Sequence, residues 1–220
     1  VSVSRARART IPAGDVRARW AWTERSVWTD RMLTALENGV GGGRWFSLID
    51  KVVNLENLFA AYVTVAERNG AAGVDHQTVE AFGERLTERL DRLEQTLRDG
   101  RYRPQEVRRV WIPKPGSREK RPLGIPTVRD RVVQRAVLHV LEPIFEREFA
   151  EHSYGFRPNR GCKDALRRVD DLLKRGYRYV VDADLRSYFD TIPQERLRER
   201  VAERVSDGRV LDLVSLFLQQ

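Results

Sequence analysis

Three carboxylates lie close together in the stretch VVDADLRSYFD, at Asp182, Asp184 and Asp190. The apolar residues before them predict a buried strand over 177–185, and side chains at i and i+2 of a strand share a face. Asp182 and Asp184 would then be neighbours, and like carboxylates this close resist joint ionisation unless a cation neutralises them. Mg²⁺ favours such oxygen ligands and shares them with phosphates, which indicates metal-assisted phosphoryl transfer. Ion pairs with the chain's many arginines would explain the aspartates equally well.

A cluster of basic side chains upstream has the right chemistry for binding phosphates. Residues 101–135 contain 11 basic and 3 acidic side chains, a net charge of +8 that equals the charge of the whole chain. The sequence VRRVWIPKPGSREKRPLGIPT alternates β-type and basic residues about a Pro/Gly turn, which predicts a β-hairpin over 107–126. Concentrated charge of this kind indicates a nucleic acid or nucleotide partner, and the alternative is a hairpin kept soluble by its charges. The basic residues are Arg108, Arg109, Lys114, Arg118, Lys120 and Arg121.

The composition excludes several other classes of protein. The 220 residues contain one cysteine, Cys162, which rules out an internal disulfide framework, and three scattered histidines, which argue against a zinc site. No apolar run is long enough to span a membrane, and the basic N-terminus lacks the apolar core of a signal peptide. We therefore expect a cytoplasmic protein that does not enter a membrane.

The elements that must position these residues are mostly helices. Residues 1–20 are Arg-rich and predict disorder, and residues 20–50 contain four tryptophans that we expect to pack on the next domain, with base stacking as the alternative. Apolar periodicity predicts helices over 54–69, 79–97, 128–150, 163–175, 194–205 and 208–218. Together with the hairpin and the strand, these helices predict an α+β fold.

The order of the motifs adds a family resemblance. IPKPGSREKRPLGIPTVRDRVVQ, HSYGFRPNRGCKDAL and YRYVVDADLRSYFDTIPQERL together resemble the group II intron reverse transcriptases, also called maturases. The upstream NGAAGVDHQTVEAF and LRDGRYRPQEVRRV are similar to the family's preceding fingers segments, so the resemblance runs from about residue 54 to 220. It implies a right-hand polymerase, with an N-terminal extension over 1–50, a fingers-like region over 51–175 and the start of the palm over 176–220.

The resemblance also implies roles for individual residues. Asp184 matches the family's first catalytic metal ligand, the carbonyl of Leu185 helps to hold the metal, and Phe189 matches the steric gate that excludes a ribose 2′-OH. Asp182 is expected to support this site and Asp190 to cap the following turn. The positions that match the family's triphosphate-binding residues are Arg108, Lys114 and Arg121. Template or RNA contacts are expected from the SYGFRP loop through Arg157, and from Arg109, Arg118 and Lys120.

The implied function is that of an RNA-directed DNA polymerase, which binds template or intron RNA, a DNA primer, dNTP and Mg²⁺, with a role in intron splicing. The family's Y-x-D-D motif, which supplies its other metal-binding carboxylates, does not occur in these 220 residues. We therefore expect a fragment that is inactive by itself. Two alternatives stay open: a non-catalytic RNA-binding module, and a related polymerase that serves phage defence or CRISPR spacer acquisition.

Overall fold

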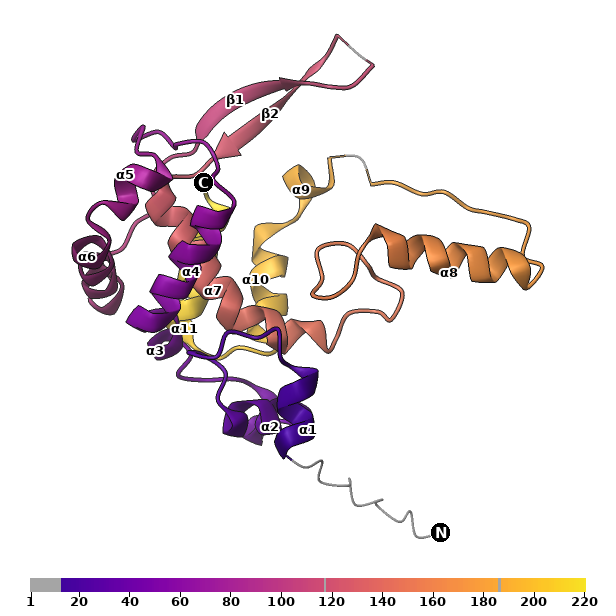
Figure 1. Cartoon of the computed structure of the whole chain (residues 1–220), viewed down its shortest axis with the longest axis horizontal. Coiled ribbons are helices and arrows are strands. Elements are labelled where there is room, and N and C mark those ends of the chain that lie inside the picture. The colour runs from indigo at the N-terminus through magenta and orange to yellow at the C-terminus, as the bar shows by residue number, and fades with distance from the viewer. Residues whose placement is uncertain (1–12, 117, 186) are drawn as a thin grey trace.

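A computed structural model describes residues 13–116, 118–185 and 187–220 of the chain (Figure 1). Within these residues the chain is rich in helices and has one two-stranded antiparallel sheet, which confirms the α+β composition. The elements are α1 (Ala13–Arg19), α2 (Asp30–Asn38), a short 3-10 turn η1 (Gly41–Gly43), α3 (Ile49–Val52), α4 (Leu55–Glu67), α5 (Val79–Gly83), α6 (Leu86–Arg98), β1 (Arg108–Pro113), β2 (Lys120–Ile125), α7 (Val128–Glu146), α8 (Cys162–Lys174), α9 (Tyr188–Thr191), α10 (Gln194–Ala202) and α11 (Gly208–Leu218).

The N-terminal segment is partly ordered. The disorder predicted for residues 1–20 is wrong for Ala13–Arg19, which form α1, while residues 1–12 lie outside the described residues. The helix is held because Val16 is buried and Arg17 pairs with Asp30 at the start of α2. The tryptophans of this segment pack in or against the core, as expected, and the Nε1 of the fully buried Trp28 donates to the carbonyl of His139 at 2.9 Å.

The centre of the molecule is the contact between α4 and α7, where α7 buries a face of valines and alanine. Asn57 on α4 is fully buried within this contact. Its side-chain nitrogen donates to the carbonyls of Lys51 and Ala136, and its oxygen faces Nδ1 of His139 at 2.9 Å. One side chain therefore joins α3, α4 and α7 and satisfies its own polar groups in doing so.

The single helix predicted over 79–97 is two helices, α5 and α6, which meet at a bend. Gly83 ends α5, and a Cβ at this position would lie 2.4 Å from the hydroxyl of Tyr62 on α4. Arg85 then leaves the helical conformation, with φ −127° and ψ 44°. The predicted buried positions are nevertheless correct for Val79 and Phe82 in α5, as they are for the three central leucines of α6.

The C-terminal elements return to the body. The backbone of Trp45 pairs with the chain on both sides of Val205, and a carboxylate oxygen of Asp207 accepts from the backbone N–H of Ile49 at 2.9 Å. A single hydrophobic cluster extends from Val16 to Leu213 and crosses both expected domain boundaries, at 50 and at 176. Packing therefore unites the extension, the fingers-like region and the last two helices.

The segment between α7 and α10 lies outside this core, and Figure 1 shows α8 projecting away from the helical body. The strand predicted over 177–185 is not formed, and Val181 is 93% exposed. The physical reason is that a strand is stabilised by a partner, and β1 and β2 pair only with each other among the described residues. α8 buries none of its side chains and exposes an apolar row of Leu166, Val169 and Leu173.

No helix among the described residues is long and apolar enough to cross a membrane.

Candidate nucleic-acid interface

A buried carboxylate fixes the base of the basic hairpin. Asp130, fully buried on α7, accepts from the hydroxyl of Tyr102 at 2.7 Å and from the backbone N–H of Gln105 at 2.9 Å, just before β1. It also accepts from the hydroxyl of Thr127 at 2.7 Å, just after β2, and Arg129 adds an ion pair at 3.1 Å. Burial and the charge of Asp130 raise the pKa of Tyr102, so its hydroxyl stays a donor. Both ends of the hairpin are therefore anchored to one side chain.

The sequence contains a further signal for this anchor in the capping pattern at Thr127 and Asp130. Thr127 caps α7 by accepting from the backbone N–H of Asp130 at 3.1 Å, so the two residues bond reciprocally across one helical turn. Ser or Thr followed three residues later by an acidic residue is typical of a helix N-terminus. The capping pattern predicts that Asp130 faces Thr127, although it does not predict Tyr102 or Gln105.

The hairpin itself is confirmed, and its pairing distributes the basic residues over two faces. Arg108 lies opposite Ile125, and Ile112 lies opposite Arg121. Directly paired residues share a face of an antiparallel sheet, so Arg108 and Arg121 are on the same face, about 13 Å apart along the strands. We call this the first face of the hairpin.

The second face carries the other strand residues expected to bind RNA. Arg109 lies opposite Gly124, and Lys120 lies opposite Pro113. Trp111 stands between these two pairs on the same face and is 55% exposed. The second face thus combines two cations with an aromatic ring between them, a combination that suits a nucleic acid strand because rings stack on bases while cations contact phosphates. Trp111 is not among the residues predicted to bind RNA, although its position two residues after Arg109 on a strand predicts this shared face.

The tip of the hairpin is closed by an ion pair. The Nζ of Lys114 lies 2.7 Å from a carboxylate oxygen of Glu119, and the two backbones are also hydrogen-bonded at 2.9 Å. The hydrogen bond from Lys114, and then its charge, lower the pKa of Glu119. Glu119 therefore partly neutralises the charge of Lys114. Arg118, at the same tip, is exposed.

Asp184 and Leu185 lie on the exposed segment that precedes α9, and Phe189 lies in α9 itself. Asp184 is exposed, and the side chain of Phe189 is 83% exposed beside the ring of Tyr188, with 5.4 Å between ring centroids. Among the described residues there is no group of three or more His, Cys, Asp or Glu side chains that could hold a metal ion. One carboxylate and one carbonyl do not fill the coordination sphere of Mg²⁺, so the described residues fit at most part of a metal site.

The expected contact between Arg157 and a template phosphate is not supported by its surroundings. Arg157 is only 8% exposed, and its guanidinium donates to the Glu146 carboxylate at 2.6 to 3.1 Å. It also donates to the carbonyls of Ala150 at 2.7 Å and Ser153 at 3.0 Å, and lies over the ring of Phe149. These contacts occupy its donors, so Arg157 holds the loop against the end of α7.

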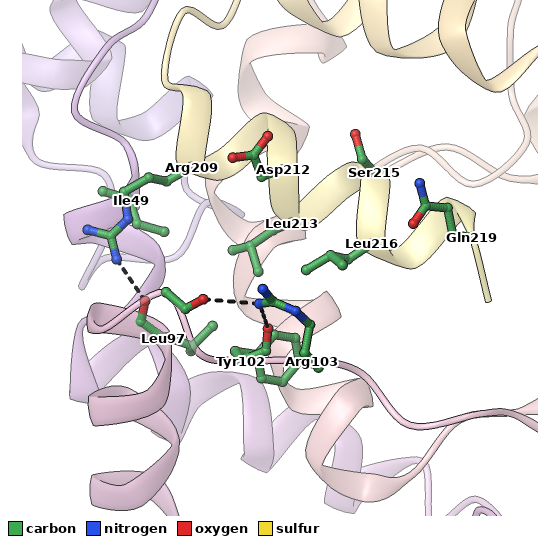
Figure 2. A pocket seen from close by; sticks show the side chains of 11 residues that line it. Ile49, Leu97, Tyr102, Arg103, Arg209, Asp212, Leu213, Ser215, Leu216 and Gln219 are labelled. Carbon is green, nitrogen blue, oxygen red and sulfur yellow. Dashed lines mark hydrogen bonds between the residues drawn. The ribbon is translucent and has the colours of Figure 1, made fainter.

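A pocket of about 350 Å³ between α6, α11 and the chain at Gly100–Arg103 does not belong to this interface (Figure 2). Its two arginines serve the fold. Arg209 donates to the carbonyls of Leu97 and Arg98 at 2.7 and 2.6 Å, and Arg103 donates to the carbonyl of Gly100 at 3.0 Å. Cations commonly satisfy the last carbonyls of a helix in this way.

Comparison with known proteins points to one family. Residues 112–218 match the family described as reverse transcriptase (RNA-dependent DNA polymerase). Protein YkfC of Escherichia coli (strain K12) is 41% identical over 160 residues, which are 70% of this chain and 42% of that protein. Group II intron-encoded protein LtrA of Lactococcus lactis subsp. cremoris is 37% identical over 166 residues, 73% of this chain and 26% of that protein. Nuclear intron maturase 1, mitochondrial, of Arabidopsis thaliana is 31% identical over 94 residues, 43% of this chain and 13% of that protein. The chain therefore spans less than half the length of each relative.

Proposed function

Because the chain belongs to the group II intron reverse transcriptase and maturase family, we propose that it forms the fingers and the start of the palm of an RNA-directed DNA polymerase. Its partners are then an RNA template or intron RNA, a DNA primer and dNTP. The observation that carries this proposal is the anchored hairpin with two basic faces. A rigid base lowers the entropic cost of holding several cations in fixed positions for phosphates.

Each face of the hairpin is proposed to bind a different phosphate-containing ligand. In this proposal the first face, with Arg108 and Arg121, holds the triphosphate of the incoming dNTP together with Lys114. The second face, with Arg109 and Lys120, contacts the RNA backbone, and Arg118 extends it at the tip. Arginine suits both tasks because its planar fork donates two hydrogen bonds to one phosphate. The ring of Trp111 would stack on a base between the two cations of the second face.

The proposed site for the chemistry is the segment from Asp184 to Phe189. Asp184 supplies one carboxylate ligand of a Mg²⁺ site and the Leu185 carbonyl a second oxygen, and the remaining ligands must come from outside the described residues. Bound Mg²⁺ neutralises phosphate charge during nucleotide transfer. Phe189 would exclude ribonucleotides, because its ring fills the space that a ribose 2′-OH needs.

The test is the variant Asp184→Asn in the complete reading frame that carries these residues. Primer extension on an RNA template should fall by at least a thousandfold, because the amide is a far weaker metal ligand. RNA affinity should stay within about twofold, since the substitution leaves the basic residues of the hairpin unchanged. Asp171→Asn, an exposed aspartate on α8, is the matched control and should keep full extension. Extension retained by Asp184→Asn contradicts the metal-ligand assignment.

The second candidate is a non-catalytic RNA-binding module. It is favoured by the exposed position of Asp184 and by the incomplete set of metal ligands among the described residues. This candidate predicts salt-sensitive RNA binding by the 220-residue chain itself, and a complete reading frame that binds RNA but does not extend a primer.

A further inference from the structure

Three arginines gather in a groove between α4 and α7 that none of the roles above uses. Arg68 follows the last turn of α4, and Arg131 and Arg135 lie one helical turn apart on α7. The groove has a volume of about 230 Å³, and its apolar floor includes Val65 and Leu138. Its lining contains no acidic side chain.

These cations lack the carboxylate partners that the fold gives to others. None of the ion pairs among the described residues includes Arg68, Arg131 or Arg135. Arg131 donates to the carbonyl of Ala71 at 2.9 Å through one Nη, but its Nε, like the Nε of Arg135, is buried without a hydrogen-bond partner. A buried donor without a partner is costly, so two of them side by side indicate a missing acceptor.

The electrostatics of the groove lead to the same conclusion. Burial lowers the pKa of both Arg131 and Arg135, and the charge of Arg68 lowers the pKa of Arg135 further. The charge of Asp75 raises the pKa of Arg131, and the charge of Glu142 raises the pKa of Arg135. Neither carboxylate is close enough to its arginine to form an ion pair. An anion bound in the groove would stabilise these cations, because Arg68 and Arg135 repel each other and both Arg131 and Arg135 are partly removed from water.

Arg157 shows what an arginine with a structural role looks like in this molecule. It has a bidentate carboxylate partner and several carbonyl acceptors, and its Nε is satisfied. In the groove, by contrast, Arg131 is the one arginine that donates a side-chain hydrogen bond to another described residue, the carbonyl of Ala71. Gly70 also keeps the groove open beside this residue, since a Cβ there would lie 2.5 Å from an Nη of Arg131.

We propose that the groove of Arg68, Arg131 and Arg135 binds a phosphodiester of an RNA backbone, at a site separate from the hairpin. Guanidinium groups that offer an Nε and an Nη edge bind phosphate oxygens in pairs, and the two non-bridging oxygens of a phosphodiester can accept from several such edges at once. The apolar floor gives the adjoining sugar a surface to pack on. This proposal rests on the proposed RNA partner and adds a second contact region to it.

The test compares two double variants of the 220-residue chain. Arg68→Gln with Arg135→Gln removes two groove charges and leaves the Arg131 bond to Ala71 in place. Arg92→Gln with Arg167→Gln removes two exposed charges on α6 and α8 and is the matched control. The probe is a fluorescein-labelled 30-nucleotide RNA stem-loop, titrated by anisotropy between 50 and 300 mM KCl. Thermal unfolding of each variant verifies that it is folded.

The groove variant should bind the RNA about tenfold more weakly than the control variant. Its plot of log affinity against log salt should be shallower by roughly 0.7 to 0.9, because that is the slope which one lost phosphate contact removes. Equal affinities and slopes for the two variants would overturn the proposal. A groove variant that loses binding of a free mononucleotide, but binds RNA like the control, would overturn the RNA backbone as the ligand.

The result is separable from the test of the polymerase itself. Loss of extension in Asp184→Asn with unchanged RNA binding in the groove variant overturns the groove alone. Retained extension in Asp184→Asn with weakened RNA binding in the groove variant overturns the metal-ligand role of Asp184 and leaves the groove supported. Absence of extension by the unaltered reading frame, with weakened RNA binding in the groove variant, overturns the polymerase assignment and leaves the groove supported.

Discussion

At the scale of single residues, type and position predict charge but not partners. Arg109 and Arg157 are the same kind of residue in similarly basic stretches, and the resemblance suggested a nucleic acid contact for both. The structure leaves Arg109 exposed on a strand and surrounds Arg157 with Glu146 and backbone carbonyls. The difference arises because Glu146 lies eleven residues earlier, at the end of another element, so no local pattern reports it. Asp182 is a similar case, since it is exposed and forms no ion pair among the described residues.

His139 makes a prediction about pH at this scale. Burial, and then the charge of Arg135, lower the pKa of His139 from 6.5 to about 4 in the folded protein. The unfolded chain keeps the ordinary value, so between these two pH values it binds more protons than the folded chain does. The stabilisation from neutral His139 is complete above about pH 6.5 and is lost as the pH falls towards 4. The loss should be about 2 to 3 kcal/mol of unfolding free energy.

Urea unfolding at pH 7.5 and 4.5 measures this contribution against His139→Gln. Glutamine does not titrate, and its amide can still donate to the Asn57 oxygen. The wild-type protein should lose about 2 kcal/mol more than the variant between the two pH values, since the carboxylates titrate equally in both. An equal loss in the two proteins would show that His139 is not the titrating group.

At the scale of elements, the sequence predicts helices and hairpins with a local pattern well, and contacts between different elements poorly. The hairpin and most helices were correct because their patterns are local. The break between α5 and α6 was missed because it depends on the room that Gly83 gives to Tyr62 on the preceding helix α4. The strand over 177–185 was wrong because apolar β-branched residues favour a strand only where another strand pairs with it.

The hairpin gives the prediction that belongs to this scale. Arg121→Ala, on the first face, should raise the KM for dNTP about tenfold or more in primer extension by the complete reading frame, with little change in RNA affinity. Arg109→Ala with Lys120→Ala, on the second face, should weaken RNA binding by a similar factor and reduce its salt slope by about two, with the KM for dNTP unchanged. If both changes affect both quantities alike, the division between faces is wrong.

At the scale of the whole molecule, one core joins three segments that were expected to be separate regions, 1–50, 51–175 and 176–220. The family resemblance implied boundaries at 50 and 176. The hydrophobic core crosses both boundaries. Its single cluster contains residues from both ends of the chain: Trp28, Ile49, Val205, Val210 and Leu213. Such long-range burial has no local signature, and the division into extension, fingers and palm stays a proposal about function.

Asp207 provides the test at this scale. It caps α11 by accepting from the N–H groups of Arg209 and Val210, and it also accepts from the N–H of Ile49. Asp207→Ala should therefore cost about 2 to 3 kcal/mol in urea unfolding, from a lost cap and an unsatisfied buried donor. Asp212→Ala, on the exposed side of α11, should change stability by less than about 0.5 kcal/mol. A cost no larger than that of the control would show that the contact with Ile49 contributes nothing.

The hydrogen bond between Asp207 and Ile49 also determines when the core can form during synthesis of the chain. The two residues are 158 positions apart in the chain, so the packing around Ile49 and Trp45 cannot be completed until residues beyond 207 have left the exit tunnel. At about 5 to 20 residues per second, this delay lasts roughly 8 to 30 seconds. During that time the apolar side chains that Val205 and Leu213 later cover stay accessible to chaperones and to other nascent chains. Helices α1 and α2 are therefore synthesised well before the residues that complete the packing around them.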